Sequence, residues 1–229
     1  MTPDEYTSIA AAVECETEIS RSRFVCLLSP VGDETAARER IARARALHPR
    51  ARHHCTAFVV GPGAEVERSN DDGEPSGTAG APMLEALRGA GVSDVVAVVV
   101  RYFGGVLLGT GGLTRAYRGA VSGALALAAP VVRQRRLRFD VRTEYAPAAA
   151  VEAEARRRGW QVESTYGARV ELRIAVGRED VAALRACVER ATAGRASPVA
   201  AGEAWVSRAG DRRSAWPPPD PSPSPRARP

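Results

Sequence analysis

The residues most able to do chemistry lie in the stretch SNDDGEPSGTAGAPML, residues 69–84. Its acidic side chains, Asp71, Asp72 and Glu74, could act as acids or bases or hold a cation. Their spacing does not match a calcium loop, whose ligands alternate along the chain, and no histidine stands nearby in the sequence. Aspartate beside glycine more often forms a turn by bonding its own backbone. We therefore predict a structural turn without a metal, and surface recognition is the alternative.

His53, His54 and Cys55 suggest zinc at first sight, in the stretch HHCTAFVVG. This stretch is typical of a strand, in which neighbouring side chains point to opposite faces, so only His53 and Cys55 could share an ion. Two further ligands at a recognisable spacing are missing. We interpret these residues as a polar pair at a strand end and a small buried thiol.

The stretch RYFGGVLLGTGGLTRAY, residues 101–117, is the second candidate site, because five glycines fall within nine positions, 104–112. Glycine lets the backbone adopt positive φ or approach a ligand closely. The spacings match neither the dinucleotide fingerprint nor a P-loop. The chain contains no lysine at all, which excludes a P-loop lysine, a Schiff-base lysine and a lysine general base.

Arg115 stands where a positive charge is unfavourable. Gly111 and Gly112 precede a predicted helix whose first backbone amides are free to bind an anion. A cation in the first turn of a helix is disfavoured by ~0.3–1 kcal/mol. The position makes more sense if a negative group shares it, and either a carboxylate of the acidic stretch or an external phosphate fits.

The elements around these sites indicate an α+β fold. Residues 13–19 and 23–28 suggest a hairpin, and Asp33 is predicted to cap a helix that ends near Leu47. A strand at residues 53–61 precedes the acidic stretch, and Pro82 fits the first turn of a short helix after it. The stretch DVVAVVVRYF is apolar on both faces, which is typical of a central strand covered on both sides.

The second half of the chain predicts a separate domain. Alternating residues near 136–142 indicate a strand, and a helix near 147–158 should end at Gly159. Strands near 160–166 and 170–176, a helix near 179–193 and a strand near 200–206 complete a βαββαβ order, which is ferredoxin-like. We expect domains at 1–130 and 131–207. Residues 208–229 are rich in proline and arginine and should be a disordered tail.

Composition limits the classes of function. Five arginines and two aspartates lie between residues 207 and 229, so the body keeps only about +2 of the net charge of +5, which is weak evidence for nucleic-acid binding. No apolar run is long enough to span a membrane, no secretory signal precedes residue 13, and four scattered cysteines favour reduced thiols. We expect a cytoplasmic protein.

The acidic stretch, the stretch VVVRYFGGVLLGTGGLTRAY and the preceding HHCTAFV together resemble the signature blocks of the YigZ/IMPACT family. The resemblance covers the first domain nearly end to end, and the second domain is similar to the C-terminal domain of bacterial members. It implies a first domain like the second domain of a small-subunit ribosomal protein and the fourth domain of elongation factor G. It implies a second, ferredoxin-like domain like the fifth domain of that factor. The tail is not part of the family pattern.

The resemblance also implies a role in translation. Eukaryotic relatives regulate translation by competing for the activator of an initiation-factor kinase, and nucleic-acid or ribosome binding has been proposed for the bacterial branch. No catalytic residue, metal or cofactor is implied. We expect the acidic turn and the glycine-rich stretch to be neighbours in one binding surface, where Tyr102 and Phe103 either stack on bases or belong to the core. This surface comprises Asp71, Asp72, Gly73, Glu74, Thr78, Arg101, Tyr102, Phe103, Gly104, Gly105, Gly109, Gly111, Gly112 and Arg115.

The function that these observations favour is a regulatory protein that binds RNA, the ribosome or a translation factor, with an anion possible at the helix start between Gly111 and Arg115. The first alternative is an enzyme acting on a phosphorylated or nucleotide substrate, with the three acidic residues as acids or metal ligands. The absence of a nucleophile motif or a histidine–carboxylate motif argues against it. The second alternative is a protein–protein adaptor that uses the same surface. The oligomeric state is not indicated.

Overall fold

A computed structural model describes residues 3–208. These residues form two compact units that join between Val132 and Arg133, close to the boundary expected at residue 130. The tail expected beyond residue 207 lies, apart from its first residue, outside the described residues. Helices and antiparallel strands are combined in both units, so the α+β class is confirmed.

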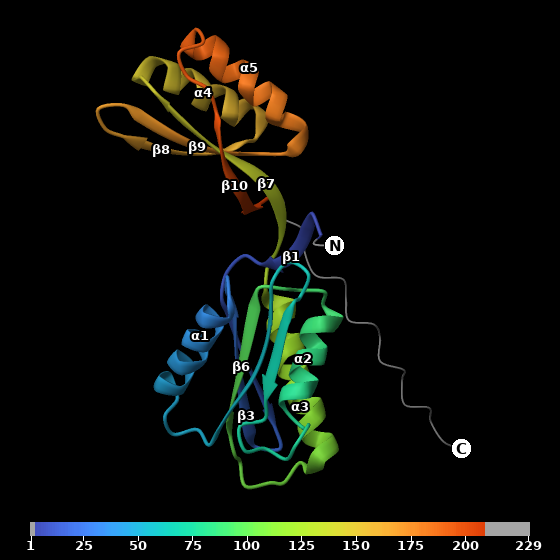
Figure 1. Ribbon diagram of the computed structural model, residues 1–229. Helices are drawn as coiled ribbons and strands as arrows, with labels where there is room; N and C mark the ends of the chain where they lie inside the picture. The colour runs from blue at the N-terminus through green and yellow to red at the C-terminus, as the bar shows by residue number, and fades with distance from the viewer. Residues whose placement is uncertain (1–2, 209–229) are drawn as a thin grey trace. The chain divides into compact units, whose positions relative to one another are not determined.

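The first unit is built on a five-stranded antiparallel sheet in the order β2-β3-β6-β4-β5. Helix α1 packs on one face of this sheet, and α2 and α3 pack on the other (Figure 1). The elements of this unit are β1 (Glu5–Ile9), β2 (Val13–Ile19), β3 (Ser22–Pro30), α1 (Glu34–Leu47), β4 (His53–Val60), β5 (Val66–Asn70), α2 (Gly80–Gly89), β6 (Val95–Tyr102) and α3 (Gly109–Leu127).

Strand β6 forms the middle of the sheet because its side chains are apolar on both faces. Val95, Ala97 and Val99 belong to the core under α2 and α3. Val96, Val98 and Val100 belong to the core under α1. Successive side chains of a strand point to opposite faces, so one valine-rich strand contributes to two cores, as the sequence predicted.

The helices begin and end where local chemistry predicts. The Asp33 carboxylate accepts a hydrogen bond from the backbone N–H of Ala36 at 2.7 Å, and α1 starts at the next residue, Glu34. Such a cap satisfies one of the backbone donors that every helix start leaves open. Helix α2 carries Pro82 in its first turn, where the missing N–H costs nothing.

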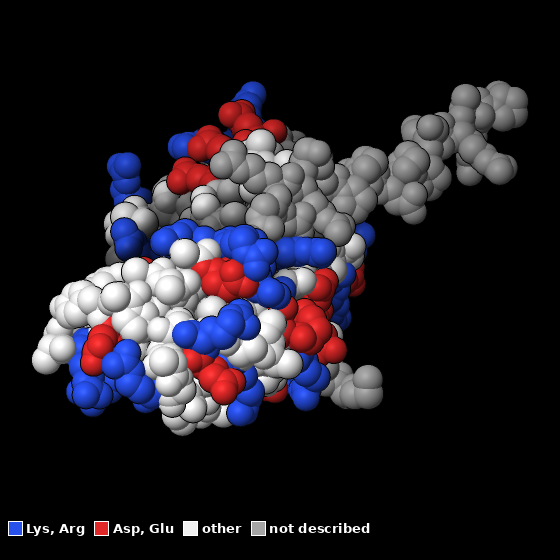
Figure 2. All heavy atoms as spheres, turned by 90° about the horizontal axis from the view of Figure 1, so that it is seen from above, with Lys and Arg blue, Asp and Glu red and all other residues white. Residues whose placement is uncertain are grey.

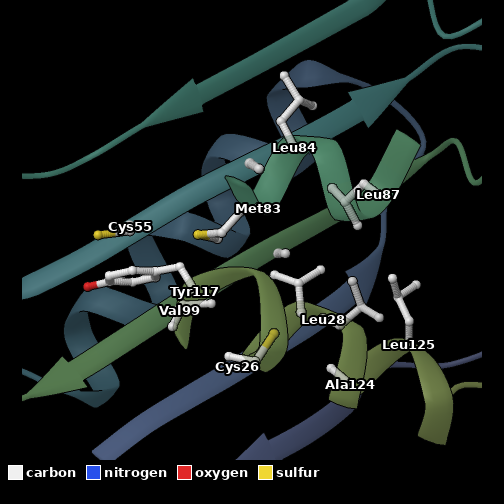
Figure 3. Close-up of a cluster of buried hydrophobic side chains, with 14 of the residues drawn as sticks. Cys26, Leu28, Cys55, Met83, Leu84, Leu87, Val99, Tyr117, Ala124 and Leu125 are labelled. Atoms are coloured by element: carbon white, nitrogen blue, oxygen red, sulfur yellow. The ribbon is translucent and has the colours of Figure 1, made fainter. Parts of the chain in front are cut away.

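Helix α3 packs along the sheet through a stripe of apolar side chains that includes Tyr117, Ala124 and Leu125 (Figure 3). Tyr117 is fully buried and meets Phe24 of β3 edge to face, with ring centroids 5.3 Å apart. An aromatic pair of this geometry contributes about 0.5–1.5 kcal/mol beyond the burial of its area. The Tyr117 ring also places a hydroxyl group at one end of this core.

The second unit has the order strand, helix, strand, strand, helix, strand that the sequence predicted. Its antiparallel sheet has the order β10-β7-β9-β8, and apolar side chains of α4 and α5 pack against it in one core. Helix α4 ends at Gly159, whose φ is 70°. Its elements are β7 (Pro130–Thr143), α4 (Tyr145–Arg158), β8 (Gln161–Tyr166), β9 (Val170–Val176), η1 (Arg178–Asp180), α5 (Val181–Thr192) and β10 (Val199–Ser207).

Two strands of the first unit were not expected from the sequence. Strand β5 has the sequence VERSN and lies at an edge of the sheet. Only one face of it meets a core, through Val66, so it lacks the apolar alternation that marks a strand. Strand β1 is equally short. Among the described residues, no helix is long and apolar enough to cross a membrane.

Candidate functional site

The acidic stretch forms a tight turn between β5 and α2. The backbone N–H of Glu74 donates to the carbonyl of Asp71 at 3.0 Å, and Asp72 and Gly73 have φ values of 46° and 87°. This left-handed region suits glycine, and aspartate more readily than most other residues. The predicted structural turn is therefore confirmed, and its geometry explains the Asp-Gly pair.

Asp71 holds the start of α2 to this turn. Its carboxylate accepts hydrogen bonds from the backbone N–H groups of Gly77 at 2.8 Å, Ala79 at 3.0 Å and Gly80 at 2.8 Å. Burial alone would raise the pKa of Asp71, but the three amide donors outweigh burial and lower the pKa. Because Ala79 has no side-chain cap to offer α2, Asp71 supplies the cap from a distance in sequence.

Asp72 joins the turn to α1 and β4. It accepts from Arg45 at 2.6 Å and 3.3 Å and from the backbone N–H of His54 at 2.7 Å. Burial opposes ionisation of Asp72, yet these donors lower its pKa. Burial also lowers the pKa of His54, because it disfavours the charged imidazolium. Both oxygens of the Asp72 carboxylate are thus used within the fold.

Glu74 and Arg101 form a buried ion pair. Nη1 of Arg101 lies 2.7 Å from Oε1 of Glu74, and the two side chains are only 7% and 3% exposed. The Tyr117 hydroxyl donates to the same carboxylate oxygen at 2.7 Å, and burial raises the pKa of Tyr117. The guanidinium of Arg101 also lies over the rings of Phe24 and Phe103, 5.5 Å from each centroid. Arg101 is therefore paired internally and does not present its charge to an external anion.

Cys55 and His53 contact the backbone of the acidic turn. The Cys55 thiol donates to the carbonyl of Asp71 at 3.1 Å, and burial raises the pKa of Cys55 to about 12. Nδ1 of His53 lies 2.9 Å from the carbonyl oxygen of Asp72. Within residues 3–208, no three His, Cys, Asp or Glu side chains are grouped so that they could hold a metal ion.

Tyr102 is the last residue of β6 and Phe103 follows it, and their side chains have different surroundings. The Tyr102 hydroxyl lies 2.9 Å from Nδ1 of His48, and its ring packs against the core under α1. The guanidinium of Arg23 lies 5.4 Å from the Tyr102 centroid. Phe103 belongs to no core cluster of the described residues and is 48% exposed. Of the two aromatic residues proposed for base stacking, Phe103 is the one that solvent reaches freely.

The loop from Phe103 to Leu108 leaves apolar side chains uncovered. Val106 is 40% exposed and Leu107 is 88% exposed. Gly104 fixes this loop against the β2–β3 turn, because a Cβ atom there would lie 2.0 Å from the backbone carbonyl of Arg21. The N–H of Gly104 donates to the Ser22 hydroxyl at 3.2 Å. The glycine is therefore required for close approach of the two backbones.

The start of α3 has open backbone donors. Its first residue is Gly109, no side chain caps it, and its first turn contains no acidic residue. Gly111 and Gly112 therefore lie inside the helix and Arg115 lies in its second turn, so the prediction that the glycines precede the helix and that Arg115 is in its first turn was wrong. Arg115 is exposed, and none of the described residues makes an ion pair or hydrogen bond with its guanidinium. Neither Asp71, Asp72 nor Glu74 neutralises it, since each bonds other groups. The alternative of an internal carboxylate for Arg115 is not what the structure has.

The predicted surface thus divides into two parts. The acidic part is structural, and Thr78 belongs to it, because its hydroxyl donates to the Pro75 carbonyl at 2.6 Å. The glycine-rich part is exposed and lies at one end of the first unit (Figure 1). We name this part the tip and define it by Arg21, Phe103, Gly105, Val106, Leu107, Gly109, Gly111, Gly112 and Arg115.

Three members of the tip were missed by reasoning from sequence. Arg21 is exposed with a φ of 64°, and it joins the tip because Gly104 packs on its backbone. No sequence signal connects residues so far apart. Val106 and Leu107 did carry a signal, since apolar side chains inside a glycine-rich loop have no core to enter.

On the sheet face opposite its helices, the described residues of the second unit form ion pairs between neighbouring strands. Arg173 lies 3.4 Å from Asp140, and Arg142 lies 3.8 Å from Glu171, on neighbouring strands. The view from above shows another face of the molecule, on which a band of basic side chains crosses the middle and acidic side chains lie next to it (Figure 2). Exposed ion pairs between strands contribute little stability, about 0–1 kcal/mol each, but they place opposite charges next to each other on the sheet face.

Comparisons with known proteins agree with the two-unit organisation. The family model described as the Impact N-terminal domain matches residues 20–125, and one described as a domain of unknown function, DUF1949, matches residues 141–195. The chain is 42% identical over 176 residues to the IMPACT family member YigZ of Escherichia coli, which covers 76% of this chain and 86% of that protein. It is 49% identical over 120 residues to the IMPACT family member YvyE of Bacillus subtilis, 52% of this chain and 55% of that protein.

A solved structure, described as the crystal structure of a hypothetical protein, matches with a TM-score of 0.63 and 38% identity. The match covers 86% of this chain and 98% of that one. These matches define a class of two-domain proteins in which the Impact N-terminal domain comes first. The chain belongs to the IMPACT family.

Proposed function

We propose that this protein acts in translation by binding RNA of the ribosome through the tip of its first unit. One observation carries the proposal: the loop after β6 exposes Phe103 and Leu107, and Arg115 in the second turn of the following helix, α3, has no partner among the described residues. The carboxylates of Asp71, Asp72 and Glu74 all bond other groups of the fold. The site therefore offers stacking, apolar contact and positive charge without a neutralising carboxylate.

These groups match the chemistry of RNA. Sequence-tolerant recognition of single-stranded RNA combines aromatic side chains that stack on bases with positive groups that follow the phosphates. Phe103 supplies an exposed ring, and Arg21 and Arg115 supply two guanidinium groups. The uncapped amides of α3 add donors for a phosphate oxygen. Salt should weaken the binding, since each phosphate contact contributes a slope of about −0.7 to −0.9 in log K against log salt.

Membership of the family also supports a role in translation. Members of the IMPACT family are known in general as translation-related regulators. The proposal includes two resemblances. The first unit would resemble a ribosomal protein domain and the fourth domain of elongation factor G, and the second unit would resemble the ferredoxin-like domain of that factor. Both analogies would place the protein at ribosomal RNA.

The enzyme alternative is less favoured by the site. A general acid or base must have an oxygen free to reach a substrate. Both oxygens of Asp71 and of Asp72 accept hydrogen bonds from the protein, and the Glu74 side chain is 3% exposed. An adaptor that binds a protein factor through the exposed apolar residues of the tip is the remaining alternative.

Sedimentation of ribosomes from a cell lysate tests the proposal. At low salt the protein should sediment with ribosomes, and washing at high salt should release it, because the contacts are ionic. Nuclease treatment of the lysate before sedimentation distinguishes RNA from a protein factor. Absence from the ribosomal fraction at low salt would contradict the proposal, and nuclease-resistant binding to another protein would favour the adaptor.

A further inference from the structure

A groove of about 450 Å³ lies between α1 and strands β4 and β5, apart from the tip. One side of it is formed by Arg38, Ala42 and Arg45, which share a face of α1 because their spacing is four and then three residues. Strand β5 forms the opposite side and is an edge strand. The residues that line it are Arg38, Ile41, Ala42, Arg45, Thr56, Phe58, Arg68, Ser69 and Asn70.

The charge of this groove is positive. Three arginines line it and no acidic side chain does. The side chain of Arg38 is 69% exposed and that of Arg45 is 47% exposed, although they pair with Glu34 and Asp72 outside the groove. Among the described residues, Arg68 donates a hydrogen bond to the backbone carbonyl of Glu67. A guanidinium has five N–H donors, so each of the three keeps donors for an anion.

The groove also has an apolar part and neutral hydrogen-bonding groups. Phe58 is 4% exposed and lies at its floor, and Ile41 and Ala42 contribute aliphatic surface from α1. The Thr56 hydroxyl and the amide NH₂ group of Asn70 lie on the strand side, on the sheet face that carries Phe58. A ligand that fits must combine a flat or apolar portion with a strongly anionic portion.

We propose that this groove binds a nucleotide, with the phosphate between the guanidinium groups and the base against Ile41 and Ala42. Its volume lies within the range of about 300–1,000 Å³ that is typical of small-molecule sites. Guanidinium groups bind phosphate through paired hydrogen bonds and stack on planar rings, so one arginine can serve either portion. Two sources supply this chemistry, a free nucleotide and the 5′-terminal nucleotide of an RNA strand.

The groove and the tip share no residue, so the two proposals are tested separately. The probe is AMP, titrated calorimetrically into the full chain. The variant Arg38→Gln with Arg68→Gln should bind AMP about a hundredfold more weakly, at about tenfold, or 1.4 kcal/mol, for each arginine. The matched control is Arg40→Gln with Arg43→Gln, which removes the same charge from exposed positions of α1 that do not line the groove. The control should keep its affinity to within about threefold.

A second variant, Ala42→Glu, places a carboxylate in the groove and should abolish AMP binding while the melting temperature stays close to that of the unsubstituted protein. Adenosine and inorganic phosphate should each bind far more weakly than AMP. An RNA oligonucleotide with a 5′-phosphate identifies the strand end as the source if it binds more tightly than its unphosphorylated form and the groove variant removes that difference. Failure to bind AMP or the 5′-phosphate, equal loss in the control variant, or equal binding of inorganic phosphate and AMP would overturn the proposal.

Discussion

Glu74 and Arg101 come from the two stretches that carry the most unusual residues of the sequence, and in the folded protein they meet. Their ion pair is almost fully buried, and Tyr117 adds a hydrogen bond to it. A buried pair of this kind does not by itself stabilise a fold strongly, because both charges lose water. Removing one partner is costly, however, because the other charge is left alone.

We expect Glu74→Gln to lower the free energy of unfolding by ~3–5 kcal/mol, since Arg101 then stays buried without a carboxylate. Arg101→Met should cost a similar amount. The double variant Glu74→Gln with Arg101→Met should cost clearly less than the sum, because no charge remains. Denaturant unfolding of the four proteins measures this cycle, and strictly additive losses would show that the two side chains are not coupled.

Asp71 gives a prediction for pH dependence. Its pKa is lowered in the folded protein, so its contribution to stability is present above the unfolded pKa of about 3.9 and is lost as pH falls through the folded pKa. Asp71→Asn should therefore be less stable than the unsubstituted protein at neutral pH, by roughly 0.5–2 kcal/mol for a lost helix cap. The difference in free energy of unfolding between the two proteins should become smaller below about pH 4. Thermal melts across pH measure it, and a difference independent of pH would argue against the ionised cap.

At the scale of elements, the loop between β6 and α3 depends on one glycine. Gly104→Ala should lower stability and disturb the tip, because its Cβ would clash with the backbone carbonyl of Arg21 rather than with a movable side chain. Gly119 is the matched control, since it lies inside α3 with nothing within 4 Å of an added Cβ. Gly119→Ala should raise stability by roughly 0.5–1 kcal/mol. Melting temperatures that move in the same direction would contradict this account.

Elements with a strong local pattern could be predicted from the sequence. Strand β6 has a continuous apolar run, α1 has its Asp33 cap, and α4 has the glycine that ends it. Strand β5 could not be predicted, because it is a polar edge strand whose pairing with β4 is set by the tertiary fold. The division of the candidate site could not be predicted either, since Arg101 and Arg115 are both arginines of the same glycine-rich stretch, each three residues from its nearest glycine. Only the fold decides that one meets Glu74 and the other meets solvent.

At the scale of the whole molecule, the pairing of each arginine with a nearby carboxylate decides where positive charge is available to a ligand. The total charge of +5 does not decide it. In the second unit, opposite charges on neighbouring strands lie near one another. Among the described residues of the first unit, the tip and the groove beside α1 both carry arginines, and we propose that each binds a ligand. These places differ in shape, because the tip is a projecting loop and the groove is a hollow. We expect them to take different parts of a nucleic acid or different ligands.

The central claim is that the tip, and not the acidic turn, binds ribosomal RNA. The most direct measurement is the affinity of purified ribosomes for the variant Phe103→Ala with Arg115→Gln, compared with the unsubstituted protein over a range of salt. Both side chains are exposed, so the melting temperature should change little. The account predicts weaker binding and a salt slope reduced by about 0.7–0.9 for the lost arginine. Unchanged affinity and slope in a folded variant would contradict it.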